Sequence, residues 1–170
     1  NILKNLDKNI IAVGTTSLRT IESLYWIGRR TERSSIKGLS ERSSGSQISQ
    51  WEAYELAKEE IPVKVALHSL LNWMTENKLE RLVTKTQILI APGYEFKIIK
   101  GLITNFHQPQ STLLLLVAAL IGDDLPSGLA PQKLCEGVQA GWKKIYDYAM
   151  QNNFRFLSYG DGSLLWRNET

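Results

Sequence analysis

Cysteine is almost absent from this sequence, and it has neither a long apolar run nor a metal-ligand cluster. The one cysteine, Cys135, cannot form a disulfide within the chain, so we expect a protein of the reducing cytoplasm. The longest apolar run, Leu113 to Ile121, is far shorter than the roughly 20 residues that cross a bilayer, and we predict no membrane partner. No His, Cys or carboxylate group has metal-ligand spacing, so we predict no metal and no cofactor.

The charge is concentrated in one segment. The chain has 170 residues, 43% of them hydrophobic, which predicts a single domain over residues 1–170. Its net charge is +3, and residues 29–50, "RRTERSSIKGLSERSSGSQISQ", carry five basic and two acidic side chains. We interpret this segment as a basic, serine-rich flexible loop within the domain. It is either a solvated insertion or a contact to an RNA backbone, where Lys and Arg gain affinity by releasing counterions.

Strands alternate with helices in the apolar pattern, and this alternation predicts an α/β fold. The predicted strands are a buried one at 9–14, then 84–91, 95–106 and the two arms of a hairpin within 154–166. The predicted helices are 17–28, 51–58, 63–76, 111–121 and a long one from Pro131 to about Ala149.

A glycine turn, "GTTSLR", joins the first predicted strand to the first helix. Gly14 permits a sharp turn, Thr15, Thr16 and Ser17 offer hydroxyls and amides at the helix N-terminus, and Arg19 adds a charge. Because free amides and the helix dipole favour negative charge, a carboxylate or phosphate fits this turn. The same hydroxyls equally fit plain helix caps.

The segment "TNFHQPQST" repeats this design between a strand and a helix. Asn105 and His107 leave the strand, and Ser111 or Thr112 caps the helix behind them. Ligands of open α/β folds bind beyond strand ends, so His107 is either a general acid or base or a structural hydrogen-bonding residue. His68 lies inside a helical pattern, and we expect it to be structural.

The segment "RFLSYGDG" places Arg155, Tyr159 and Asp161 around a glycine turn. Asp161 could serve as a base or hold a ribose hydroxyl, and Tyr159 could stack on a base or donate a hydrogen bond. The alternative is an ordinary hairpin in which aspartate suits the turn.

Three segments together carry a family resemblance. "IIAVGTTSLRTIES", "APGYEFKIIKGLITNFHQPQSTLLLLVAALIG" and "FRFLSYGDGSLL", in this order, resemble the S-adenosylmethionine:tRNA ribosyltransferase-isomerases of queuosine biosynthesis. The resemblance implies that the chain is the C-terminal part of the family's main α/β domain, without the β-barrel domain that the family inserts upstream of "GTTS". It therefore implies an active site that these residues only partly supply.

The resemblance also implies a reaction and its partners. Family members transfer the ribosyl part of S-adenosylmethionine, a co-substrate, to 7-aminomethyl-7-deazaguanine at the tRNA wobble position. The product is epoxyqueuosine, and adenine and methionine leave. By this resemblance His107 and Asp161 are the proton-transfer candidates and the "GTTSLR" turn suits a carboxylate or phosphate. Asn105, Arg155 and Tyr159 suit sugar, base or backbone contacts, with Ser111 and Thr112 starting the helix behind the nucleoside pocket.

Three other functions stay open at this stage. The domain could be a noncatalytic nucleoside-binding or scaffolding piece, or an S-adenosylmethionine-dependent tRNA methyltransferase, although the glycine-rich loop usual in such methyltransferases is not evident. It could also be an RNA-binding module that works through residues 29–50.

Overall fold

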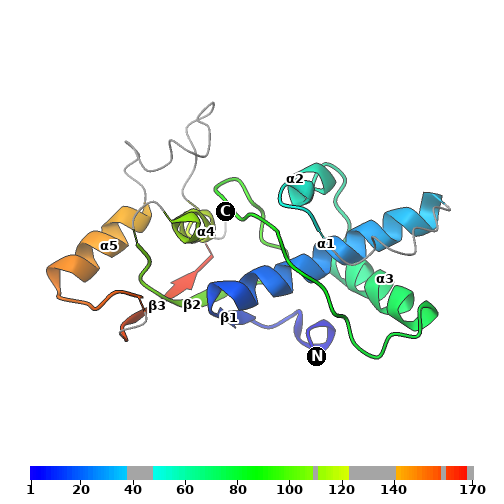
Figure 1. Ribbon diagram of the computed structural model, residues 1–170, viewed down its shortest axis with the longest axis horizontal. Helices are drawn as coiled ribbons and strands as arrows, with labels where there is room; N and C mark the ends of the chain where they lie inside the picture. The colour runs from blue at the N-terminus through cyan, green and yellow to red at the C-terminus, as the bar shows by residue number, and fades with distance from the viewer. Residues whose placement is uncertain (38–47, 109–110, 123–140, 158–159, 168–170) are drawn as a thin grey trace. The chain divides into compact units, whose positions relative to one another are not determined.

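A computed structural model of the chain describes residues 1–37, 48–108, 111–122, 141–157 and 160–167 (Figure 1). Within it the chain forms two compact units. Unit 1 comprises Asn1–Lys8 and Arg19–Leu89, and unit 2 comprises Asn9–Leu18 and Ile90–Thr170. The single domain over residues 1–170 stays a prediction.

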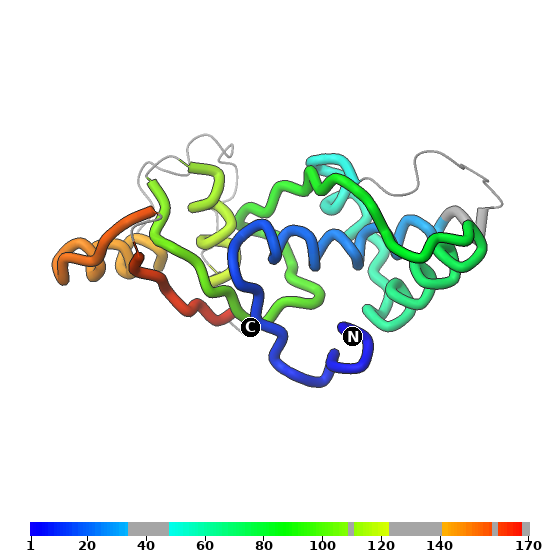
Figure 2. Tube along the Cα trace, turned by 60° about the horizontal axis from the view of Figure 1, so that its bottom comes forward, coloured from blue at the N-terminus to red at the C-terminus, as the bar shows by residue number. Residues whose placement is uncertain are grey.

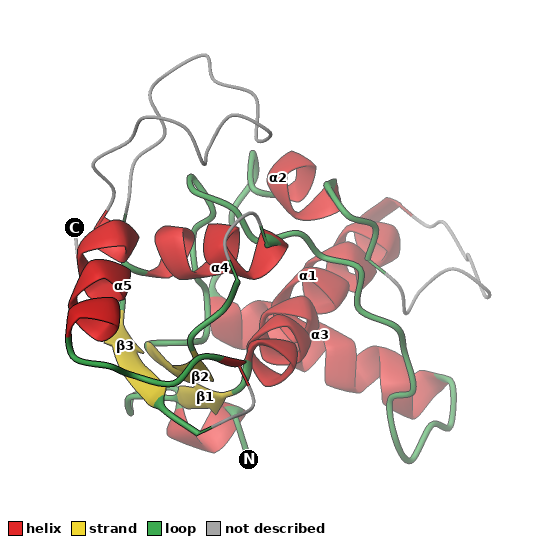
Figure 3. Cartoon of the chain, turned by 60° about the vertical axis from the view of Figure 1, so that its left-hand side comes forward, coloured by secondary structure: helices red, strands yellow, loops and turns green. Residues whose placement is uncertain are grey.

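Unit 2 contains a mixed three-stranded sheet. Strand β2 (Gly101–Asn105) lies in the centre, parallel to β1 (Ile11–Val13) and antiparallel to β3 (Gly162–Trp166). Helices α4 (Thr112–Leu120) and α5 (Gly141–Gln151) contact each other in the same unit (Figure 3). A sheet combined with helices confirms the predicted α/β class.

The inner face of the sheet carries the core of unit 2. Side chains alternate along β2, so Leu102 and Thr104 are buried while Ile103 and Asn105 are exposed. Beyond the strand, Phe106 enters an aromatic cluster with residues from α5 and the segment after it. The cluster comprises Phe106, Leu114, Trp142, Ile145, Tyr146, Ala149, Phe154 and Phe156.

The opposite face, called the outer sheet face below, is apolar and exposed. The register sets Val13 beside Ile103 and Ile103 beside Leu164, and all three are at least 42% exposed. Gly101 lies between Ile11 and Trp166, and a Cβ built on it would meet the Trp166 ring at 3.1 Å. The prediction of a buried first strand is therefore wrong, because β1 buries only Ala12.

Unit 1 is helical. It contains the 3-10 helix η1 (Leu3–Asn5), most of α1 (Thr15–Lys37), α2 (Glu52–Leu56) and α3 (Val63–Glu76). Helices α1 and α3 run side by side, and a Cβ on Gly28 would lie 2.1 Å from the Ala66 carbonyl oxygen (Figure 2). Only glycine allows this approach. No helix in the described ranges is both long and apolar enough to cross a membrane.

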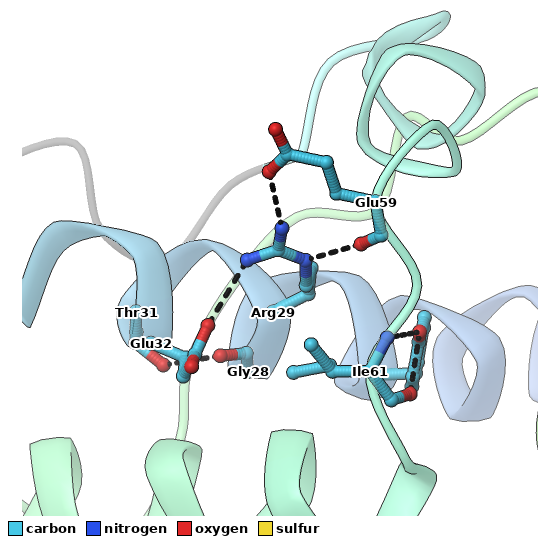
Figure 4. Close-up of polar contacts among 7 residues, drawn as sticks. Gly28, Arg29, Thr31, Glu32, Glu59 and Ile61 are labelled. Atoms are coloured by element: carbon cyan, nitrogen blue, oxygen red, sulfur yellow. Dashed lines mark hydrogen bonds and ion pairs between the residues drawn. The ribbon is translucent and has the colours of Figure 1, made fainter. Parts of the chain in front are cut away.

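An arginine of α1 connects this helix to Glu59, which follows α2 in unit 1. Arg29 is 4% exposed; its Nε donates to the Glu59 carbonyl, and its two terminal nitrogens pair with carboxylates of Glu32 and Glu59 at 3.0 and 2.9 Å (Figure 4). Arg30 pairs with Glu52 at 3.1 Å. The prediction of a flexible loop beginning at residue 29 is therefore wrong up to Lys37, because helix α1 continues to that residue and acidic partners neutralise Arg29 and Arg30. Residues 38–47 of that segment lie outside the described residues.

The predicted helices 51–58, 63–76 and 111–121 are confirmed as α2, α3 and α4, and 17–28 lies inside α1. Of the predicted last helix, the part in α5 is confirmed, and residues 131–140 lie outside the description.

Two predicted strands are wrong. Residues 84–91 form no ladder; side chains hold them to α1 instead, through Ser23–Thr86 and Arg19–Ile88 hydrogen bonds. The described residues 154–157 form no first hairpin arm, because Asn153 and Leu157 have left-handed φ values of 58° and 60°. Strand β3 pairs with β2 rather than with that segment.

Candidate functional site

Three polar segments meet at one edge of the sheet in unit 2. Because β1 and β2 are parallel, both end there, and antiparallel β3 begins there. The Gly14 amide donates to the Ile103 carbonyl at 2.8 Å, and Asn105 pairs with Gly162. Adjacent strands lie about 4.8 Å apart, so the three segments fall within about 10 Å. We call residues 14–17, 105–107 and 160–161 the polar edge.

The "GTTS" turn starts helix α1. Gly14 has φ +85°, which glycine adopts readily, and its carbonyl accepts the Leu18 amide at 3.1 Å. Thr15 is half-buried, whereas Thr16 and Ser17 are exposed. A helix points its first amides out of this end, and its dipole favours an anion there. The turn can therefore hold a carboxylate or phosphate.

Arg19 does not join this group. Its Nε donates to the Ile88 carbonyl at 2.9 Å, and both residues belong to unit 1. We therefore leave Arg19 out of the polar edge.

His107 is held at two atoms. Its Nε2 lies 2.9 Å from the Thr104 hydroxyl, and its backbone amide donates to the Tyr146 hydroxyl at 2.9 Å. Burial lowers the pKa of the His107 imidazole below its ordinary value of 6.5. The ring is therefore mainly neutral near pH 7, and a neutral imidazole can accept a proton.

Asp161 contacts Arg155 across the glycine turn. Its Oδ2 accepts the Arg155 amide at 2.6 Å and lies 3.6 Å from Arg155 Nε. Gly160 has φ +132°, and a Cβ there would come within 3.0 Å of an Arg155 terminal nitrogen. These contacts close the turn, while the Arg155 side chain stays 69% exposed.

The remaining predicted residues take different positions. Asn105 is exposed, and its Oδ1 lies 3.8 Å from where a Cβ on Gly162 would stand. The Ser111 hydroxyl accepts the Leu113 amide at 3.1 Å, so Ser111 is the predicted cap of α4, and Thr112 is exposed in its first turn. Tyr159 lies outside the described residues. Within the described ranges, no group of three His, Cys, Asp or Glu side chains could hold a metal ion.

Two residues that contact His107, Thr104 and Tyr146, were not predicted from the sequence. Thr104 precedes it by three positions within the apolar strand, and Tyr146 comes from a helix 39 positions later. The spacing of Thr104 and His107 at a strand end was a weak signal for the first. Nothing in the sequence indicated Tyr146, because its contact depends on how α5 packs.

In open α/β folds, ligands bind beyond the carboxyl ends of the strands, where polar loops gather. The polar edge has this arrangement, which is typical of a ligand-binding domain. The model of the family described as "Queuosine biosynthesis protein" matches residues 1–165. The chain therefore belongs to the queuosine biosynthesis protein family.

Curated relatives are similar to most or to about half of this chain. An S-adenosylmethionine:tRNA ribosyltransferase-isomerase of Ruegeria pomeroyi is 33% identical over 92% of this chain and 26% of its own length. One of Cereibacter sphaeroides is 46% identical over 48% of this chain and 19% of its own length. The crystal structure of an S-adenosylmethionine tRNA ribosyltransferase from Thermotoga maritima is 26% identical, with a TM-score of 0.45 over 95% of this chain and 34% of that one. The chain thus spans about a quarter of the curated relatives it matches.

Proposed function

We propose that this protein carries part of the site of an S-adenosylmethionine:tRNA ribosyltransferase-isomerase. In this reaction the ribosyl group of S-adenosylmethionine moves to 7-aminomethyl-7-deazaguanine at the wobble position of tRNA. It rearranges to give epoxyqueuosine, and adenine and methionine leave. The observation that carries the proposal is the meeting of three polar segments at one edge of the unit 2 sheet. Relatives with this activity in their names match the same chain.

The polar edge supplies groups that suit this substrate. The first turn of α1, after Gly14, suits the methionine carboxylate, because a helix N-terminus favours an anion. The exposed amide of Asn105 suits a ribose hydroxyl, since it can both donate and accept. The exposed guanidinium of Arg155 suits a phosphate of the tRNA backbone.

His107 is the better of the two candidate bases. The reaction needs a group that removes a proton from the carbon beside the sulfonium, and burial keeps the imidazole of His107 neutral by lowering its pKa. Asp161 already uses Oδ2 to hold the Arg155 amide. We therefore assign the proton transfer to His107 and the holding of the turn to Asp161.

Adenine release tests the proposal. The protein is incubated with S-adenosylmethionine and tRNA carrying 7-aminomethyl-7-deazaguanine, and free adenine is measured. His107→Ala should lower turnover about 10²- to 10⁴-fold, the usual contribution of a general acid or base. His68→Ala is the matched control, because His68 is exposed on α3 in unit 1, and it should keep the wild-type rate. Turnover within a few-fold of wild type in His107→Ala would refute the assignment.

The product distinguishes the competing functions. S-adenosylhomocysteine in place of adenine would indicate a methyltransferase, and tRNA binding without either product would indicate a binding module. Because the chain spans about a quarter of its curated relatives, the assay is run twice. One sample is the chain alone, and the other is the chain joined to the remaining sequence of the Ruegeria pomeroyi relative.

A further inference from the structure

Among the described residues, His107 makes one hydrogen bond through its ring and one through its backbone amide. Nε2 contacts the Thr104 hydroxyl, and the backbone amide contacts Tyr146. No residue in the described ranges bonds to Nδ1. A neutral imidazole carries one N–H and one lone pair, so the role of Nε2 decides the role of Nδ1.

We propose that Thr104 is a positioning residue that accepts the Nε2–H of His107 and so leaves the Nδ1 lone pair to remove the substrate proton. This inference rests on the proposed function for its catalytic part. The proton leaves the carbon beside the sulfonium and joins Nδ1, while the electron pair of the C–H bond stays on that carbon, next to the positive sulfur.

The bond to Thr104 becomes stronger as the proton arrives. In the imidazolium both ring nitrogens carry hydrogen, so Nε2–H still donates to the Thr104 hydroxyl. A hydrogen bond from a charged donor is about twice as strong as a neutral one. Thr104 therefore stabilises the cation that proton transfer creates, as well as fixing the tautomer that accepts the proton.

Both partners of His107 are held rigidly. Thr104 is 6% exposed on the central strand, and its carbonyl accepts the Ser163 hydroxyl of β3 at 3.3 Å. Tyr146 packs edge-to-face against Phe106 with ring centres 5.4 Å apart. A side chain fixed by packing loses little entropy when it orients its neighbour.

No charged group competes for this ring among the described contacts. Thr104 from β2 does not titrate, and burial raises the pKa of the Tyr146 hydroxyl above its ordinary value of 10.0, so it stays neutral. The protonation of His107 therefore reports on its burial and on the bond to Thr104.

An NMR titration of the imidazole nitrogens tests the bond directly. Thr104→Val keeps the shape of the side chain and removes the hydroxyl, and Thr104→Ser keeps the hydroxyl. If Thr104 accepts from Nε2–H, its loss weakens the charged form more than the neutral one, so the pKa of His107 should fall in Thr104→Val. The wild-type ¹⁵N shifts should show hydrogen on Nε2, and Thr104→Ser should match wild type. His68, exposed on α3, is the internal reference in every sample.

Two titration results would overturn the proposal. A rise in the pKa of His107 in Thr104→Val would mean that the hydroxyl donates to Nε2 and that Nδ1 carries the hydrogen. An unchanged pKa would mean that the hydrogen bond has no effect on the ring.

Turnover tests the catalytic part. Thr104→Val should lower kcat about 10-fold or more with KM little changed, as loss of an orienting partner does. Thr104→Ser should restore most of the rate, whereas a valine effect that serine does not rescue would refute positioning. Thr75→Val removes a threonine hydroxyl that bonds to the Leu71 carbonyl on α3, and it should keep the wild-type kcat. If the wild type releases no adenine, the proposed function fails, and the titration still decides the hydrogen bond.

Discussion

At the residue scale, the side chains of Asn105 and His107, at the end of β2, lie toward different faces of the sheet. Asn105 is exposed on the outer side, whereas His107 turns its ring back to the buried hydroxyl of Thr104. A ligand that touches both residues therefore lies across the end of the strand rather than on either face. A ligand in this position also lies near the "GTTS" turn, because β1 ends at the same edge of the sheet.

The burial of His107 predicts a pH dependence of stability. Its folded-state pKa lies below the unfolded value of about 6.5, so the unfolded chain binds protons first as pH falls. The free energy of unfolding should thus be highest above pH 6.5, fall as pH drops below it, and level off below the folded-state pKa. Urea unfolding between pH 5 and pH 8 measures this.

Variants isolate the contribution of this one histidine. His107→Gln should flatten the His-dependent part of the pH profile, whatever its effect on absolute stability. His68→Gln is the matched control, because it replaces the exposed histidine of α3 in unit 1 by the same residue. An unchanged slope in His107→Gln would show that burial of this ring does not set the pH dependence.

Individual site residues were predictable only in part. Asn105 and His107 stood out because they follow an apolar strand and precede a capped helix. Thr104 gave only a weak signal, its spacing of three positions from His107, and Tyr146 gave none, because its contact depends on how the distant helix α5 packs. The pairing of Arg29 with Glu59 was equally hidden, because Glu59 lies 30 positions away in the sequence.

At the element scale, the two faces of β3 should respond differently to mutation. Leu165 is 6% exposed on the inner face, and Leu164 is 51% exposed on the outer sheet face beside Ile103. Leu165→Ala should cost about 2–4 kcal/mol of unfolding free energy, because it opens a cavity in the core. Leu164→Ala should cost less than about 1 kcal/mol.

Chemical denaturation of the two alanine variants checks this prediction. Each variant is the control for the other, since the substitution is the same and the positions are adjacent. Equal costs, or a greater cost at Leu164, would contradict the register of β3 against β2.

Helices were easier to predict than strands, for a physical reason. The helical pattern of 63–76 is local, and α3 covers those residues. A strand needs a partner, and sequence does not reveal which apolar segments pair. Residues 84–91 bury Ile88 and Ile90 without joining a sheet. Strand β3, in contrast, pairs with β2, which lies far from it in the sequence.

At the scale of the whole molecule, the polar edge lies entirely in unit 2, which contains Asn9–Leu18 and Ile90–Thr170. Unit 1 contains Arg19 and the neutralised arginines of α1. The family model reaches over both, and the chain spans about a quarter of its curated relatives. We therefore propose that the substrate contacts made by these residues lie in unit 2.

The most direct test is a map of amide chemical shifts as S-adenosylmethionine is added to the ¹⁵N-labelled chain. We expect the shifts to be concentrated at residues 14–17, 105–107 and 160–161, with α3 in unit 1 unchanged as the internal control. Shifts confined to unit 1, or none at saturating ligand, would contradict the claim that the polar edge binds this substrate.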